Sequence, residues 1–225
     1  MGVCVLVLGQ SGSGKSTSLR NFSADEIGIF NVTKKPLPFK KRLPKLDGAT
    51  YNQIKTSLAQ NKRNAYVIDD ANYLMAFDSF NKARETGYSK FTDMAVSFEK
   101  LLEAAANTSD DTIVYFFMHA DTNEVTQRVQ PKTIGKMLDT QLCIEGLFPI
   151  VLMSERNERG YRFITTTDGY TPAKAPMGML DSEMDNDLKE VDTKIREYWQ
   201  MKIFEPKKPK KQAKEQQEKE ETTKE

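Results

Sequence analysis

Cysteine and histidine are scarce in this sequence: Cys4, Cys143 and His119 are the only such residues among 225. The two cysteines lie far apart and have neither the spacing of metal ligands nor the pattern of a disulfide framework. A zinc site or a disulfide-stapled scaffold is therefore not indicated. We expect a reducing, intracellular setting.

The sequence also lacks a charge excess and a long hydrophobic run. Lysine and arginine total 33 against 32 aspartates and glutamates, so the net charge is only +1. Any attraction to nucleic acid or membrane must then be local. The start Met1-Gly2-Val3-Cys4 resembles a signal peptide or acylation site, but it has no basic segment, and Leu6 stands where acylation needs Ser or Thr. We expect no membrane partner and a cytoplasmic location.

A glycine-rich run from Gly9 to Thr17 is the most informative stretch that is present. It fits the pattern G-x-x-x-x-G-K-[ST], follows an apolar run over residues 3–8 and precedes a predicted helix over 16–22. Glycines let backbone N–H groups turn toward phosphate oxygens, and the lysine supplies a positive charge. We predict an ATP-binding P-loop, with nucleotide contacts from Gly9, Gln10, Ser11, Gly12, Ser13, Gly14, Lys15, Ser16 and Thr17.

Two carboxylates end the predicted strand over residues 65–70. Asp69 is placed to bind Mg²⁺ together with the hydroxyl of Ser16, since hydroxyl and carboxylate oxygens suit this ion. Asp70 points differently in an extended chain and is a candidate to orient or deprotonate an attacking water. The alternative for Asp70 is a cap on the helix that follows.

The single histidine, His119, ends another buried strand, predicted over residues 112–119. A polar side chain there is a candidate to sense the terminal phosphate. The alternative is a structural histidine that is hydrogen-bonded near the strand end.

Residues 34–45 form the most basic stretch of the core and contain three prolines, which exclude a regular helix or central strand. One interpretation is a solvated loop. The other is a nucleic-acid contact in which basic side chains neutralise phosphates and an aromatic ring stacks on a base. The residues predicted for this contact are Lys34, Lys35, Phe39, Lys40, Lys41 and Arg42.

The remaining pattern completes an α/β fold. It predicts a strand over 27–32, helices over 51–61 and from about 91 to 105, a polar and mobile stretch over 71–87, and a helix from Thr133 onward. Strands over 148–153 and 160–166, joined by a turn over 155–159, predict a hairpin. We expect a three-layer P-loop fold with an open, mostly parallel α/β sheet and a C-terminal antiparallel hairpin.

We expect one folded core over residues 1–180, followed by an amphipathic helix over 181–204 and a disordered charged tail over 205–225. The helix should begin near Ser182, with Asp185 at capping-box spacing, and its apolar stripe must pack on the core. A basic cluster over 207–211 is either a solvated tail or a nucleic-acid contact.

The order of these motifs resembles a family of small phage-encoded P-loop ATPases with a RecA-like core. The similarity includes the P-loop, segments 31–39, 67–70 and 87–91, and residues 132–136 through 145–148. That family is associated with phage recombination and replication, and some relatives assist single-strand annealing with a single-strand-binding protein.

The resemblance implies nucleotide and Mg²⁺ positions at Lys15, Ser16, Asp69 and Asp70, and a polar sensor at His119. It also implies that Arg128, Lys132 or Lys136 acts on the phosphate of a neighbouring subunit. No glutamate stands where RecA-like recombinases place their base, and the acidic pair is more similar to that of AAA-type ATPases.

Three functions remain open from the sequence. The leading hypothesis is a homo-oligomeric, Mg²⁺-dependent ATPase acting on DNA, particularly single-stranded DNA. The second is a kinase that transfers phosphate to a nucleotide or polynucleotide. The third is a slow nucleotide-dependent binding module that recruits a replication partner.

Overall fold

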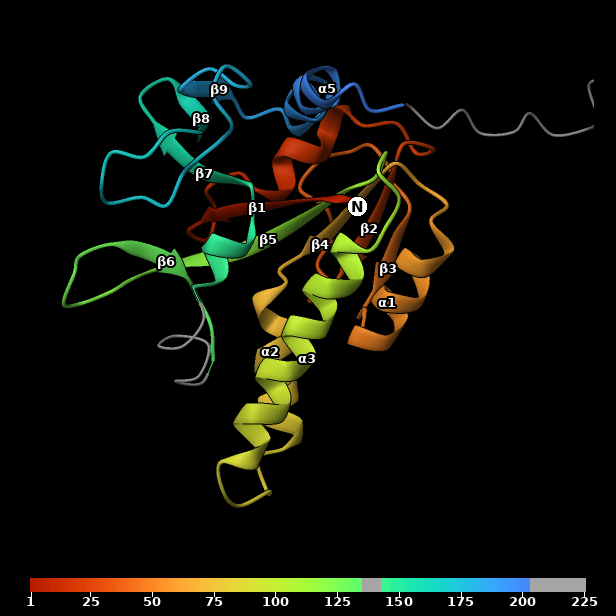
Figure 1. Cartoon of the computed structure of the whole chain (residues 1–225), viewed down its shortest axis with the longest axis vertical. Helices are drawn as coiled ribbons and strands as arrows, with labels where there is room; N and C mark the ends of the chain where they lie inside the picture. The colour runs from red at the N-terminus through yellow and green to blue at the C-terminus, as the bar shows by residue number, and fades with distance from the viewer. Residues whose placement is uncertain (135–142, 203–225) are drawn as a thin grey trace, which may run out of the picture.

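The computed structural model describes residues 1–134 and 143–202, and its central feature is a twisted sheet (Figure 1). Five buried or nearly buried strands form its parallel centre: β1 (Val3–Gly9), β2 (Ile27–Asn31), β4 (Ala65–Asp69), β5 (Ile113–Thr122) and β7 (Ile150–Asn157). These are the apolar runs that the sequence predicts as strands, because a strand covered on both faces needs apolar side chains at every position.

The order of the sheet is β3-β2-β4-β5-β1-β7-β8-β9. Strand β5 therefore lies between the P-loop strand β1 and the acidic strand β4, with Gly9 opposite His119. Strand β8 (Gly160–Ile164) extends the sheet antiparallel to β7, and β9 (Glu183–Asp185) pairs antiparallel with β8. The predicted fold class, a mostly parallel α/β sheet with a C-terminal antiparallel hairpin, is confirmed.

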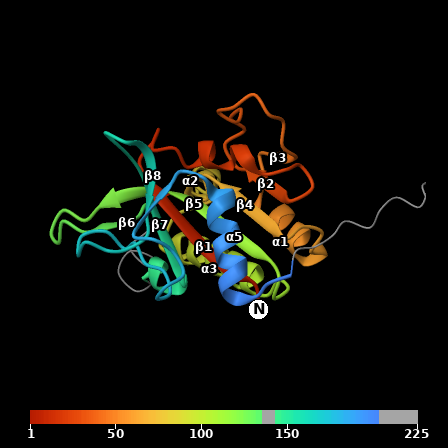
Figure 2. The same cartoon turned by 90° about the horizontal axis from the view of Figure 1, so that it is seen from above.

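Alternating side chains of the sheet build two cores, one on each face. Leu6 and Leu8 of β1 contribute to the core under α1 (Tyr51–Gln60), α2 (Asn72–Asn81) and α3 (Ser89–Ala106). Val5 and Val7 contribute to the opposite core, which includes residues of η1 (Ser16–Asn21) and α5 (Leu188–Trp199). Figures 1 and 2 show α5 on the face away from α1 and α3, which gives the three predicted layers.

Several predictions of helices differ from the structure. The segment after the P-loop is a 3-10 helix of six residues, and the stretch over 71–87, predicted to be polar and mobile, contains α2. The last helix begins at Leu188 with Asp187 as its N-cap, not near Ser182, because residues 183–185 pair with β8 as strand β9. The predicted helix from Thr133 lies largely outside the described residues.

Three short strands carry no sequence signal of their own. These are β3 (Lys45–Asp47), β6 (Val129–Pro131) and β9, each of three residues. In addition, β7 runs on through residues predicted as a turn, so the hairpin turn is shorter than expected and is centred on Glu158 and Arg159. The short 3-10 helix η2 (Ile144–Leu147) precedes β7.

The division into a core, a C-terminal helix and a tail stays a prediction. Helix α5 packs its apolar stripe on the sheet through Leu188, Val191 and Ile195, which are fully buried. The predicted tail over 205–225 lies outside the described residues. No helix within 1–134 and 143–202 is long and apolar enough to span a membrane.

Candidate functional site

The P-loop closes β1 and leads directly into η1 with the backbone geometry that its glycines allow. Gly12 and Gly14 have φ angles of 79° and 101°, in the region that strains other residues. A Cβ added at Gly14 would lie 2.9 Å from a ring carbon of Tyr161, so this position needs glycine for space as well. Among the described residues, none accepts a hydrogen bond from the backbone N–H of Gly12, Gly14 or Lys15. These donors are available to phosphate oxygens.

Lys15 lies inside the loop. Its ammonium group donates hydrogen bonds to the carbonyl oxygens of Gly9 at 2.7 Å and Gln10 at 3.0 Å, and the residue is only 7% exposed. Burial lowers the pKa of Lys15 to about 8, against the opposing effect of Asp70 and Asp69. A bound anionic phosphate would therefore stabilise the protonated form of Lys15, which burial disfavours in the protein alone.

Ser16 and Asp69 meet across the site as the sequence predicts. The Ser16 hydroxyl lies 3.0 and 3.1 Å from the two carboxylate oxygens of Asp69. Burial and the nearby charge of Asp70 raise the pKa of Asp69 to about 6. A cation placed between these oxygens would favour the ionised carboxylate.

Asp70 is held by three donors. Its Oδ2 accepts hydrogen bonds from the Thr33 hydroxyl at 2.8 Å and from Lys35 at 3.0 Å, and its Oδ1 lies 3.3 Å from His119 Nε2. Burial alone would raise the pKa of Asp70, but the hydrogen bonds from His119, Lys35 and Thr33 hold it far below its ordinary value. Its φ is 62°, in the left-handed region that side-chain-bearing residues rarely adopt.

The alternative role for Asp70 as a helix cap is wrong. The N-cap of α2 is Ala71, with no side-chain cap.

His119, which lies beside Asp70, is held by residues of α2. Its backbone N–H donates to Asn72 Oδ1 at 3.1 Å, and its ring packs edge-on against the ring of Tyr73, with 5.8 Å between the ring centres. His119 therefore has both a structural surrounding and a place in the site.

These groups surround one cavity of about 350 Å³. Its walls are formed by P-loop residues 11–17 and by side chains from distant segments: Lys35, Pro36, Pro38, Asp69, Asp70, His119 and Tyr161. The sequence does not predict Thr33 and Tyr161 as members of this site. Their only signal is position, because Thr33 lies shortly after β2 and Tyr161 lies near the start of β8.

The oxygen donors fit Mg²⁺ held together with a nucleotide. Within residues 1–134 and 143–202, no cluster of three or more His, Cys, Asp or Glu could enclose a metal. Ser16 and Asp69 supply a hydroxyl and a carboxylate, and Mg²⁺ usually takes one or two such groups and completes its shell with phosphate oxygens and water. This donor set suits a Mg²⁺–nucleotide site.

Of the cations predicted to act on a neighbouring subunit, Arg128 and Lys132 are exposed and flank β6 (Val129–Pro131). Arg128 lies on the arm formed by β5 and β6, which extends beyond the body of the sheet (Figures 1 and 2). Lys132 lies at the base of this arm, because its backbone N–H donates to the carbonyl oxygen of His119 at 2.8 Å. Neither lines the P-loop cavity of its own chain. Lys136 lies outside the described residues.

The predicted nucleic-acid residues do not form one surface. Lys35 is paired with Asp70 in the P-loop cavity, Lys34 lines a separate cleft, and Phe39 is half-buried against the core next to η1. Packing of Phe39 argues against its predicted role as a free stacking ring. The exposed basic side chains that remain are Lys40, Lys41 and Arg42.

No protein-family model matches this sequence, and no curated protein matches it. Among solved structures, one match is a chain described as a prototypical ATPase from the type III secretion system of pathogenic bacteria. It is 16% identical, with a TM-score of 0.47, over 69% of this chain and 52% of that chain. This chain thus spans about half the length of that ATPase chain.

Proposed function

We propose that this protein binds ATP with Mg²⁺ and hydrolyses it. The observation that carries the proposal is the single cavity in which Lys15, the Ser16–Asp69 pair and the Asp70–His119 pair meet. Free N–H groups and Lys15 receive the phosphates, and Ser16 and Asp69 hold the Mg²⁺, which offsets the charge that develops during phosphoryl transfer.

Asp70 acts in this proposal by positioning other groups. A carboxylate with a strongly lowered pKa is a weak base, so it is poorly suited to remove a proton from water. It holds Lys35 and His119 at the mouth of the P-loop, where a cation and an imidazole can contact the terminal phosphate and orient the attacking water.

We propose further that a second copy of the chain completes the site. The protruding arm carries Arg128, which does not line the cavity of its own chain, and Lys132 at the base of the arm, next to His119, does not line it either. A cation supplied in trans accelerates phosphoryl transfer by about 10³- to 10⁵-fold in other P-loop enzymes, so turnover should depend on assembly.

In this proposal the ATPase acts on single-stranded DNA during phage recombination or replication in the host cytoplasm, and its partner is a single-strand-binding protein. The support is the order of motifs and the exposed basic side chains of residues 40–42.

The test measures ATP turnover per protomer against protein concentration, with and without single-stranded DNA. We expect turnover to rise with both, and Lys15→Ala to abolish ATP binding. Turnover that is flat in protein concentration and in DNA contradicts the proposed mechanism. Product analysis separates the rival kinase, because a kinase moves labelled phosphate to an acceptor and a hydrolase releases it to water.

A further inference from the structure

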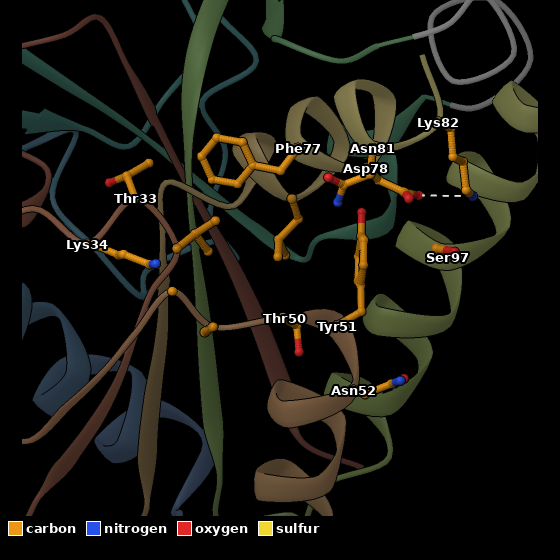
Figure 3. Close-up of a pocket in the computed structure, with 14 residues that line it drawn as sticks. Thr33, Lys34, Thr50, Tyr51, Asn52, Phe77, Asp78, Asn81, Lys82 and Ser97 are labelled. Atoms are coloured by element: carbon orange, nitrogen blue, oxygen red, sulfur yellow. Dashed lines mark hydrogen bonds and ion pairs between the residues drawn. The ribbon is translucent and has the colours of Figure 1, made fainter. Parts of the chain in front are cut away.

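A second cavity of the described chain is larger than the P-loop site. It is a cleft of about 710 Å³ beyond the carboxyl end of β2, between the start of α1 and the facing sides of α2 and α3 (Figure 3). Its size is in the range of small-molecule sites, about 300–1,000 Å³.

One part of the cleft is suited to a flat apolar ring. Phe77 is 43% exposed and lies at the wall, with Val32 and Leu74 beside it. Aromatic side chains with a free face stack on nucleobases of any sequence, because every base has a π face.

The opposite part offers polar atoms. The hydroxyl of Tyr51 is buried and has no hydrogen-bond partner within the described residues, and Figure 3 shows it directed toward Asp78 and Asn81. A buried polar atom without a partner is unfavourable, so a ligand that satisfies it gains free energy. Asn81 presents an amide, which can donate to and accept from the edge of a base.

Positive charge is available at both ends of the cleft. Lys34 extends into it beside Gly48, where an added Cβ would lie 2.4 Å from the lysine side chain. Lys82 lies at the other side and is paired with Asp78 at 3.3 Å. Lys34 is the cation free to meet a phosphate, since no ion pair to it is found within the described residues.

Two short connections join this cleft to the P-loop site. Along the chain, Thr33 and Lys35 both donate to Asp70, while Lys34 between them lines the cleft. Along α2, Phe77 packs against Tyr73 at 5.8 Å, and Tyr73 in turn packs against His119 at 5.8 Å. The ammonium of Lys35 also lies 5.4 Å from the centre of the Tyr73 ring.

We propose that this cleft binds a nucleotide unit, with its base on Phe77, its polar edge at Tyr51 and Asn81 and its phosphate at Lys34, and that Thr33–Lys35 and Tyr73 transmit occupancy to Asp70 and His119. The unit belongs either to a single-stranded nucleic acid or to a free nucleotide, which share this chemistry. Binding of the nucleotide unit does not depend on the proposed ATPase function, whereas transmission of occupancy to Asp70 and His119 rests on it.

The binding test uses the full chain with labelled oligodeoxythymidylate, and with free dTMP and dAMP as competitors. Phe77→Ala should weaken binding by about 5- to 150-fold, the loss expected for one stacked base. Phe80→Ala is the matched control, because Phe80 is on the same helix, is 77% exposed and does not line the cleft. Asn81→Ala provides a second variant if Phe77→Ala alters the thermal unfolding curve.

The source of the unit follows from the competitors. Binding of the oligonucleotide that free nucleotides do not displace identifies a single strand, and displacement identifies a free nucleotide. Equal losses in Phe77→Ala and Phe80→Ala, or no loss in Phe77→Ala and Asn81→Ala, overturn the binding proposal. The binding and competition measurements can be repeated in Lys15→Ala. This variant should not bind ATP at the P-loop, so a change in oligonucleotide binding is not confused with a change in ATP binding.

The transmission test compares Lys34→Gln with Lys100→Gln, an exposed lysine of α3 that lines neither cavity. We expect Lys34→Gln to lose the stimulation of ATP turnover by the bound unit and Lys100→Gln to keep it. Unchanged stimulation in Lys34→Gln and in Tyr73→Ala overturns transmission. Absence of ATP turnover in the wild type instead contradicts the proposed function and leaves the binding result intact.

Discussion

Asp69 and Asp70 are adjacent, but their environments move their pKa values in opposite directions. Burial and the charge of Asp70 raise the pKa of Asp69 to about 6, whereas three hydrogen-bond donors lower that of Asp70. The sequence predicts both carboxylates at the site, because they end an apolar strand. It could not predict the division of roles, which depends on donors from Thr33, Lys35 and His119.

Asp69→Asn should stabilise the protein at neutral pH while it removes Mg²⁺-dependent ATP binding. The folded-state pKa of Asp69 is raised from 3.8 to about 6, so its favourable contribution is present at acid pH and is lost as pH rises through about 6. Removing the buried charge should add about 1–3 kcal/mol to the free energy of unfolding at pH 8. Urea unfolding at pH 5 and pH 8 measures this, and a variant that is less stable at pH 8 contradicts it.

Asp70→Asn tests the positioning role. The amide loses the charge that holds Lys35 and His119, so ATP turnover should fall by about 100-fold or more while ATP affinity stays within a few-fold. Rapid-quench turnover and fluorescent-nucleotide binding give the two quantities. If DNA binding persists without hydrolysis, ATP is chiefly a conformational ligand.

Nucleotide binding should take up a proton near pH 8. Lys15 has a pKa of about 8 without ligand, and phosphate at the loop restores its charge. Calorimetric titration in buffers of different ionisation enthalpy detects the uptake. An ATP-binding enthalpy that does not depend on the buffer at pH 8 would contradict it.

At the scale of elements, α5 is attached by more than the apolar stripe seen in the sequence. Arg196 is 6% exposed and donates to Asp192 at 2.6 Å, and Asp192 also accepts from the Tyr115 hydroxyl at 2.9 Å. The same guanidinium donates to the carbonyl oxygens of Asp111 and Asn64 at 2.9 Å. Periodicity predicts the helix, but a charged residue on its buried side has no sequence signature, because such residues are usually solvated.

Arg196→Leu should lower the free energy of unfolding by about 3–5 kcal/mol, since it leaves Asp192 buried without its cation. Lys194→Ala is the control on the same helix: its pair with Asp181 is exposed, and its loss should change stability little. Denaturant unfolding compares the two, and similar losses would mean that the buried pair does not anchor α5.

At the scale of the whole molecule, the order of strands creates the site. Strand β5 lies between β1 and β4, which brings His119 between the P-loop and the acidic pair. The sequence identifies each of these strands by its apolar run, but no local pattern specifies which strand lies next to which. Strands β3, β6 and β9 are not predicted from the sequence either, because three residues are too few to show a periodicity.

Assembly can be tested by complementation between two inactive variants. Lys15→Ala should lose ATP binding in its own site, and Arg128→Ala should lose the cation that it supplies to a neighbour. A mixture should recover part of the turnover, because some interfaces then combine an intact P-loop with an intact arginine. Lys132→Ala replaces Arg128→Ala if the latter remains active. No recovery with either partner contradicts completion of the site in trans.

Lys34 and Asp70 carry a consequence for how this chain could evolve. Both have φ near 60° without being glycine, and each such residue costs about 1 kcal/mol or more. Glycine at position 34 would relieve this cost, but it would also remove the cation from the cleft and the side chain that rests on Gly48. Selection for thermal stability alone would thus replace Lys34 with glycine. The more stable protein would then lose the proposed transmission between the cleft and the P-loop cavity.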